Sequence, residues 1–135
     1  MGWLPRERIV ACVGLCLLLA LGAALAAFRQ SPQAQLEGRW LGQRFESLDG
    51  SVGAGRTGWA KGTSLTFSGS RISVQVPGEP ARQGAYEVLR ERDGELELAI
   101  TGHDGHIDRT ELTLETDDLL RWHLTPVHTL VMHHD

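Results

Sequence analysis

The stretch GAYEVLRERDGELELAIT, residues 84–101, decides the fold class of this chain. Apolar and polar side chains alternate on both sides of the dipeptide Asp93-Gly94, so residues 84–90 and residues 95–101 each present one apolar face. Asp-Gly is typical of a two-residue hairpin turn because both turn positions need a positive φ. The stretch therefore predicts two antiparallel strands joined by a tight turn.

The same alternation extends in both directions along the chain. Gly69-Ser70 and Asp104-Gly105 supply two further candidate two-residue turns. Eight short strands, each next to its neighbour in sequence, favour an all-β, antiparallel, up-and-down barrel, because closure gives the first and last strands a partner. The predicted strands are residues 40–48, 64–68, 71–76, 84–90, 95–101, 107–115, 119–124 and 127–134.

One face of these strands supplies a core for such a barrel. The set is large enough to fill a small barrel, so the sequence leaves open whether an interior cavity remains. The apolar residues with inward parity are Trp40, Phe45, Leu65, Phe67, Ile72, Val74, Val76, Tyr86, Val88, Leu96, Leu98, Ile100, Leu112, Leu114, Leu120, Trp122, Leu124, Leu130 and Met132.

A glycine-rich connection, residues 49–62, joins the first two predicted strands, and we expect no regular structure there. It contains one large aromatic residue, Trp59. An amphipathic ring at this place has three possible roles: it can cap the barrel mouth, dock a partner or contact a membrane interface. Packing against the domain's own core is the favoured interpretation, because exposed tryptophan is uncommon without a partner.

The N-terminal segment, residues 9–28, reads IVACVGLCLLLALGAALAAF and contains no charge. At about 1.5 Å per residue it spans a hydrocarbon core of roughly 30 Å, and the arginines before it direct the domain out of the cytoplasm. The run is longer than that of a typical signal peptide, whereas Ala24-Leu25-Ala26 matches a signal-peptidase site. Residues 1–28 are therefore expected to be a transmembrane anchor or, alternatively, a signal peptide. Residues 29–35 are polar and are expected to form a linker ahead of a domain at residues 36–135.

Composition excludes several classes of protein. Beyond residue 30, ten basic and sixteen acidic residues leave a formal charge of −6. Nucleic-acid binding needs clustered Lys and Arg, so no nucleic-acid partner is expected. Both cysteines, Cys12 and Cys16, lie in the apolar N-terminal run, so the domain has neither a disulfide framework nor a zinc-thiolate site.

Two short motifs resemble those of a known family. Gly38-Arg39-Trp40, at the start of the first predicted strand, is similar to the Gly-x-Trp motif of lipocalins. Thr116-Asp117-Asp118 stands where lipocalins carry a Thr-Asp-Tyr turn. Residues 36–135 therefore resemble the short lipocalin-like domains of bacterial exported proteins. The resemblance implies that Trp40 plugs the closed end of the barrel and that Gly38, Thr116 and Asp117 belong to the structural motif.

The chain departs from the lipocalin pattern in two places. Asp118 replaces the tyrosine of the second motif, and the last predicted strand lacks the arginine that lipocalins carry there. His133 and His134 stand near that position, and the parity of Arg121 turns it away from Trp122.

The resemblance implies a non-catalytic binding module for a small apolar ligand or an envelope protein, with Trp59, Tyr86 and Trp122 as candidate binding residues. A filled barrel with a structural or assembly role is the alternative, and an interior cavity separates the two. Either role places the chain in a bacterial cell envelope. The domain is expected outside the cytoplasm, held by a single inner-membrane span, or periplasmic or secreted if the chain is cut after Ala26.

All six histidines fall in the last third of the chain. His103 and His106 flank the predicted Asp104-Gly105 turn, which is expected to place their Cβ atoms about 4.5–5.5 Å apart. Asp108 adds an oxygen, and imidazole suits zinc, copper and nickel, so His103, His106 and Asp108 form a candidate metal site. The other four are expected at outward strand positions, His123 and His128, or at a frayed terminus, His133 and His134.

No catalytic or cofactor motif occurs in the sequence. The chain lacks a Gly-x-Ser-x-Gly elbow, a His-Glu-x-x-His helix, a phosphate loop and a dinucleotide fingerprint. We therefore expect neither enzymatic activity nor a cofactor. Six glutamates that alternate with apolar residues are expected on the solvated outer face of the barrel: Glu87, Glu91, Glu95, Glu97, Glu111 and Glu115.

Overall fold

The computed structural model describes residues 30–48 and 54–135 of the chain. Within them, Pro32–Asp135 forms one compact unit. The segment predicted as an anchor or signal peptide, residues 9–28, lies outside the described residues. Among the residues that are described, no helix is both long and apolar enough to cross a bilayer.

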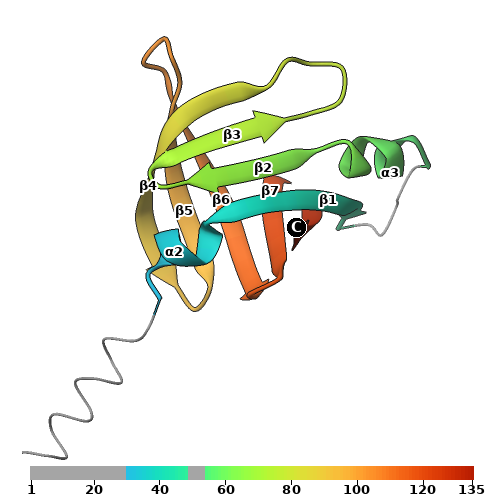
Figure 1. Cartoon of the computed structure of the whole chain (residues 1–135). Coiled ribbons are helices and arrows are strands. Elements are labelled where there is room, and N and C mark those ends of the chain that lie inside the picture. Colours follow the sequence, from blue (N-terminus) through green and yellow to red (C-terminus); the bar gives the residue numbers. More distant parts are fainter. Residues whose placement is uncertain (1–29, 49–53) are drawn as a thin grey trace, which may run out of the picture. The chain divides into compact units, whose positions relative to one another are not determined.

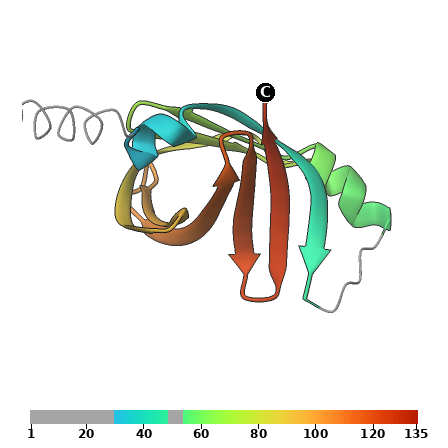
Figure 2. The ribbon, with the colours of Figure 1, turned by 90° about the horizontal axis from the view of Figure 1, so that it is seen from below.

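The described residues form a closed antiparallel barrel of eight strands in sequence order, which confirms the predicted architecture (Figure 1). Strands β1 to β3 cross in front of β6 and β7, and β4 curves from one layer to the other. The barrel closes where β1 pairs with β8, and Figure 2 shows these two strands side by side. The strands are β1 (Gly38–Ser47), β2 (Ser64–Ser68), β3 (Arg71–Gln75), β4 (Arg82–Arg92), β5 (Glu95–Thr101), β6 (Ile107–Thr116), β7 (Leu119–Thr125) and β8 (His128–His134).

Two of the three predicted tight turns form as expected. Ser68 pairs with Arg71 around Gly69-Ser70, and Arg92 pairs with Glu95 around Asp93-Gly94. Asp93 and Gly94 both have positive φ, 51° and 83°, as this hairpin turn requires.

The predicted two-residue turn at Asp104-Gly105 is wrong. Thr101 pairs with Ile107, so residues 102–106 form a longer loop between β5 and β6. The Asp104 carboxylate accepts a hydrogen bond from the His106 backbone N–H at 3.0 Å, and this local bond stabilises the loop in place of a tighter turn.

Two short helices occupy segments where no regular structure was expected. Helix α3 (Ala54–Lys61) lies in the glycine-rich connection, and its end packs directly on the β1 backbone. A Cβ atom on Gly42 would lie 1.9 Å from the carbonyl oxygen of Ala60, so the helix depends on glycine at that position. The helix is stabilised by this tertiary contact, which local sequence pattern does not encode.

Helix α2 (Pro32–Leu36) overlaps the segment predicted as a linker, and the compact unit that contains it starts at Pro32. The Gln33 side chain donates to the Gly69 carbonyl at 2.8 Å, and the Glu37 carboxylate accepts from the Gly69 N–H at 3.0 Å. Leu36 is completely buried. These contacts attach the segment to the β2–β3 turn.

The core follows the predicted inward parity closely. Every residue of the predicted inward set is buried in the core or packed against it, except Val76, which is half-buried. The helices add Leu36, Trp59 and Ala60 to the core. The buried cluster comprises Leu36, Trp40, Phe45, Ala60, Leu65, Phe67, Ile72, Tyr86, Leu96, Leu98, Leu112, Leu120, Leu130 and Met132.

Candidate functional site

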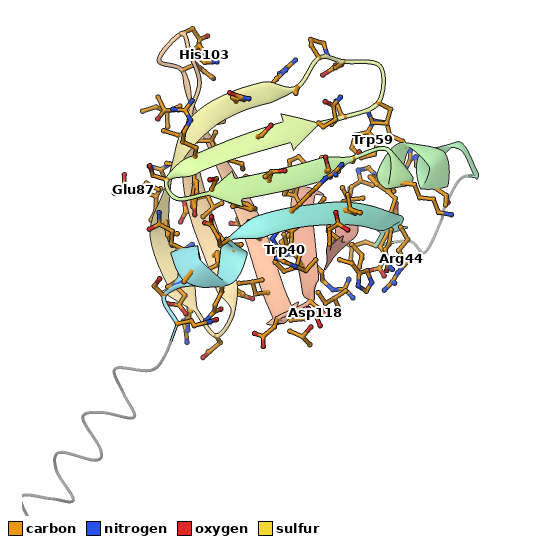
Figure 3. The ribbon with its side chains drawn as sticks, in the orientation of Figure 1. Trp40, Arg44, Trp59, Glu87, His103 and Asp118 are labelled. Carbon is orange, nitrogen blue, oxygen red and sulfur yellow. The ribbon has the colours of Figure 1, made fainter. Side chains whose placement is uncertain are left out.

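The two ends of the barrel are built from different elements, because the connections of an up-and-down barrel alternate between them. Helix α2, the β2–β3, β4–β5 and β6–β7 turns and the C-terminus share one end, which we call the closed end. Helix α3 and the β3–β4, β5–β6 and β7–β8 connections share the other, which we call the open end. Figure 3 shows Trp40 beside the start of β1 and His103 at the tip of the β5–β6 connection.

Trp40 plugs the closed end. Its side chain is completely buried, and its Nε1–H donates to the Leu36 carbonyl at 2.9 Å. The His134 ring packs edge-on against the indole, with 4.8 Å between ring centroids. Gly38 has a φ of +114°, and a Cβ atom there would lie 2.4 Å from Nε2 of His134. Glycine is therefore needed two residues before the tryptophan.

The C-terminus is part of this plug, and the expectation that it frays is wrong. The His134 imidazole donates from Nε2 to the Glu37 carbonyl at 3.0 Å, and the Asp135 N–H donates to the Arg39 carbonyl at 2.8 Å. The Asp118 carbonyl accepts from the His134 N–H at 3.1 Å. The second motif thereby joins the first through β8.

A pocket of about 880 Å³ lies at the open end, between the β3–β4 and β5–β6 connections. This volume is within the range of about 300–1,000 Å³ that is usual for small-molecule sites. Its apolar lining comes from the inward faces of β3, β5 and β7, where most of these side chains are only half-buried. The large apolar lining residues are Ile72, Val74, Val76, Ile100 and Trp122, and Pro80 and Ala81 of the β3–β4 connection also line the pocket.

One hydrogen bond joins two side chains of the pocket lining. The Trp122 indole donates from Nε1 to Oγ1 of Thr110 at 2.8 Å. Both side chains line the pocket and both are half-buried. Thr110 has inward parity, since it pairs with the core residue Leu98.

The rim of the pocket is charged. Two of its acidic groups contact basic neighbours of the rim, with Arg82 to Glu79 at 3.4 Å and His106 to Asp108 at 3.0 Å. These contacts are solvent-exposed, so each contributes little to stability. The charged or ionisable rim residues are Glu79, Arg82, His103, Asp104, His106, Asp108 and Arg109.

Comparison with known proteins adds one solved structure. It is described as the crystal structure of a lipocalin-like protein from Bacteroides uniformis ATCC 8492, and it aligns with a TM-score of 0.52 over 75% of this chain and 99% of that chain. The fold is lipocalin-like. Sequence identity is 13%, so the likeness concerns the fold alone. No family model matches the chain, and no curated protein matches it significantly.

The lipocalin-like barrel brings only one of the three predicted binding residues to the pocket. Trp122 lines it, whereas Trp59 packs against the core with its ring 6.2 Å from that of Phe45. Tyr86 is buried against Phe67, at a centroid distance of 5.1 Å. Burial, and to a smaller extent the Glu37 carboxylate, raises the pKa of the Tyr86 hydroxyl. Tyr86 therefore belongs to the core.

The candidate metal residues all lie on the rim of the pocket but do not form a ligand set. His106 contacts Asp108, and both side chains are mostly exposed. Nowhere in the described ranges do three or more His, Cys, Asp or Glu side chains gather in a way that holds a metal ion.

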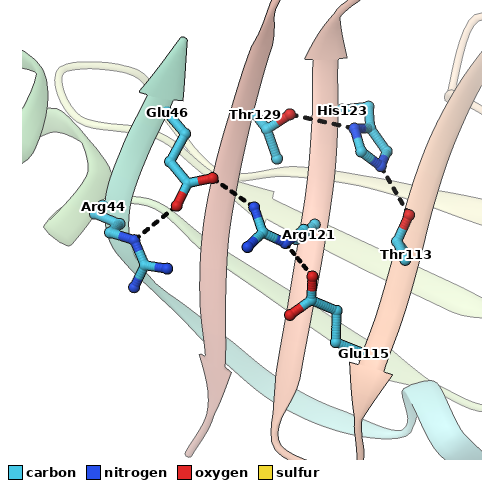
Figure 4. A network of polar contacts seen from close by, with 7 residues as sticks. All are labelled: Arg44, Glu46, Thr113, Glu115, Arg121, His123 and Thr129. Carbon is cyan, nitrogen blue, oxygen red and sulfur yellow. Dashed lines mark hydrogen bonds and ion pairs between the residues drawn. The ribbon is translucent and has the colours of Figure 1, made fainter. Parts of the chain in front are cut away.

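His128 does not face outward as predicted. Its ring lies 5.3 Å from the ring of Phe45, a core residue, and its Nδ1 is 3.0 Å from Oγ1 of Thr125. His123 does face outward, as the parity of β7 predicts. It hydrogen-bonds to Thr113 at 2.8 Å and to Thr129 at 3.2 Å (Figure 4).

A charged network covers the outer face near the seam between β1 and β8 (Figure 4). Arg121 contacts both Glu46 and Glu115, and Arg44 contacts Glu46 at 2.9 Å. The hydrogen bond from Arg121, and then that from Arg44, lowers the pKa of the Glu46 carboxyl. In the register, Val131 lies between Arg44 and Arg121, and it is completely buried although it faces outward.

The pocket includes residues that sequence reasoning placed only in the core. Parity gave Ile72, Val74 and Ile100 an inward direction, but it does not show which inward residues a loop leaves uncovered. Thr110 was missed because a threonine among outward glutamates carries no apolar signal. The alternation of β6 does indicate its direction, because Thr110 has the opposite parity to the outward Glu111 and therefore faces inward.

Proposed function

We propose that this chain is a non-catalytic binding module that holds a small apolar or amphipathic molecule at the open end of its barrel. The observation that carries the proposal is the pocket of about 880 Å³, with its lining of Val74, Val76, Ile100 and Trp122. Burying such side chains against an apolar ligand is favourable by roughly 25 cal/mol per Å². The lipocalin-like fold supports the same conclusion, since the fold builds one closed and one open end.

Two smaller hollows are weaker candidates for the site. They occupy about 420 and 390 Å³ on the outer face of the sheet, and both are bordered by Glu97, Glu111 and His123. Most of their lining residues are charged or polar, and they offer less apolar surface to a ligand than the pocket at the open end does. The open end combines the larger volume with the apolar lining that small-molecule sites usually have.

The absence of catalytic motifs in the sequence and the outward position of three strand glutamates support a role without chemistry. Glu87, Glu95 and Glu111 are exposed on the outer face, away from the pocket. A purely structural role requires a filled barrel, and the open pocket favours ligand binding over that alternative.

A titration with N-phenyl-1-naphthylamine, a neutral apolar fluorophore, tests the proposal. We expect saturable enhancement of its fluorescence with one site per chain. Val74→Trp places a large ring in the pocket and is expected to abolish binding, whereas Val127→Trp, on an exposed turn, leaves it unchanged. Equal binding by both variants, or no saturable binding by the unmodified chain, contradicts the proposal.

We further propose that the barrel acts outside the cytoplasm of a bacterial cell, behind an uncleaved anchor at residues 9–28. The support is the length of this uncharged run and the arginines that precede it. Carbonate washing of membranes tests the anchor. A full-length chain that stays with the membrane supports it, whereas a soluble product that starts at Ala27 rules it out.

A further inference from the structure

The pocket at the open end has two unlike walls, and the difference follows the strands that build them. Strand β3 lines the pocket with Ile72 and Val74, which are aliphatic. Strand β6 lines it with Asp108, Arg109 and Thr110, which are polar. Because β1 to β3 cross in front of β6 and β7, the two linings face each other across the pocket (Figure 1). A ligand between them meets hydrocarbon on one side and polar groups on the other.

The polar wall extends inward from the rim. Asp108 pairs with the apolar lining residue Ile100, which pairs with the core residue Tyr86, so Asp108 has inward parity. Thr110 has the same parity and lies farther along β6, where it pairs with the buried Leu98. The chemistry of the pocket therefore changes from one side to the other and not only with depth.

The polar wall offers acceptors at two positions. Oδ1 of Asp108 lies 3.0 Å from Nε2 of His106, and a carboxylate has about four lone-pair sites, so this contact does not saturate it. Oγ1 of Thr110 accepts from the Trp122 indole at 2.8 Å, and a hydroxyl oxygen has a second lone pair. The two positions are two residues apart on one strand, which separates their Cα atoms by roughly 6.5–7 Å. Two hydroxyl groups along one edge of a ligand match this spacing.

The apolar wall has a charged group only where β4 begins. Arg82 pairs with Val74, but its guanidinium contacts Glu79 of the β3–β4 connection at 3.4 Å, and its side chain is 79% exposed. Such an exposed ion pair remains hydrated and contributes little. The surface that β3 presents to a ligand is therefore Ile72 and Val74.

We propose that the pocket selects a rigid ring ligand that is amphipathic across its width, with a hydrocarbon edge against β3 and two hydroxyl groups on the opposite edge, toward Asp108 and Thr110. This inference rests on the proposed function. A rigid ring holds both hydroxyl groups in place before binding, which lowers the entropic cost of binding. A long-chain amphiphile with its polar group at one end presents one polar position to a wall that has two.

Competition against N-phenyl-1-naphthylamine on the full chain tests the arrangement of the hydroxyl groups. Naphthalene-2,7-diol carries both on one edge of its rings, whereas naphthalene-2,6-diol carries them on opposite edges. The Val74→Trp chain supplies the background signal. We expect the 2,7-diol to compete about fivefold more strongly than its isomer. Equal competition, or preference for the 2,6-diol, overturns the inference while leaving the proposed function in place. Failure of the fluorophore itself to bind overturns both.

A methylated ligand and a variant test the hydrogen bonds. 2,7-Dimethoxynaphthalene keeps both oxygens but has no donor, so it is expected to compete about fivefold more weakly than the 2,7-diol. Asp108→Asn replaces a carboxylate oxygen with a donor and is expected to weaken the 2,7-diol about fivefold, while the affinity for the fluorophore changes by less than about twofold.

Asp117→Asn, on the exposed β6–β7 turn at the closed end, is the matched control and should bind both compounds like the unmodified chain. Equal competition by the diol and its dimethyl ether overturns the inference. So does an unchanged affinity for the 2,7-diol in Asp108→Asn. An equal loss of fluorophore affinity in that variant also overturns it, because altered pocket structure then explains the result.

Discussion

The two ends of the barrel use the same strands for different purposes. At the closed end, Trp40 and Leu36 are completely buried, and β1, α2 and β8 are joined there by hydrogen bonds. At the open end, Val74, Ile100 and Trp122 have the same inward parity but remain half-buried beside a pocket. Inward parity thus determines which side chains enter the barrel, and the segments packed across each end determine whether they stabilise the fold or meet a ligand.

The largest effect is expected at the closed end. Trp40→Ala removes a completely buried ring and leaves a cavity between α2 and His134, so it should lower the free energy of unfolding by about 3–5 kcal/mol. Urea denaturation followed by circular dichroism measures the change. A loss below roughly 1 kcal/mol, the scale of a surface substitution, would contradict the assignment of Trp40 as the plug.

A smaller loss is expected when the plug keeps its tryptophan but loses its glycine. Gly38→Ala forces a side chain into a left-handed conformation at φ +114° and displaces the His134 ring from Trp40. The expected cost is about 1–3 kcal/mol. Gly78→Ala is a useful control, since its φ is also positive but no atom lies within 4 Å of the added Cβ. If the two variants lose equal stability, the contact with His134 contributes nothing measurable to the free energy of unfolding.

Trp122→Ala provides the matched substitution at the open end. Because its ring is half-buried, we expect a loss of about 1–2 kcal/mol, well below that of Trp40→Ala. Affinity for N-phenyl-1-naphthylamine should instead fall more than about tenfold, since the variant removes the largest side chain that lines the pocket. A stability loss as large as that of Trp40→Ala would remove the distinction between the two ends.

The smallest effect lies on the outer seam, away from both ends. The pKa of Glu46 is lowered in the folded chain, so its contribution is present above the unfolded value near 4.5 and is lost as the pH falls through the folded value. Glu46 is partly exposed, so we expect only about 0.5–1 kcal/mol.

Urea unfolding between pH 7 and pH 3.5 measures this contribution. The unmodified chain should lose more stability on acidification than Glu46→Gln does. Glu87→Gln, on the exposed outer face of β4, should behave like the unmodified chain. Parallel pH profiles for all three chains would show that the bond between Arg121 and Glu46 contributes nothing.

The strands could be predicted from the sequence because each carries its own evidence. Alternation along β2 and β5 gave their bounds without error, and positive φ at Asp93 and Gly94 follows from the residue types. Helix α3 carries no such evidence. It forms where the Ala60 carbonyl packs on Gly42, a contact between positions that local pattern treats as independent.

The site was harder to predict than the fold. Trp122 was recognised from its type and parity, but the pocket also depends on how far the β3–β4 and β5–β6 connections stand apart, which residue types do not specify. Val131 shows the same limit on the outer face. It is completely buried at a position that the register places between two arginines on neighbouring strands, and the pattern of its own strand does not indicate those neighbours.

The pairing of β1 with β8 has a consequence for how the chain reaches its folded state. His134 bonds to the Glu37 carbonyl across 97 residues of sequence, so the barrel cannot close before residue 134 has been synthesised. Until then one edge of β1 is unpaired, and contacts of such long range slow folding to milliseconds or longer. A chain cut short before His128 would keep that edge permanently and is expected to aggregate.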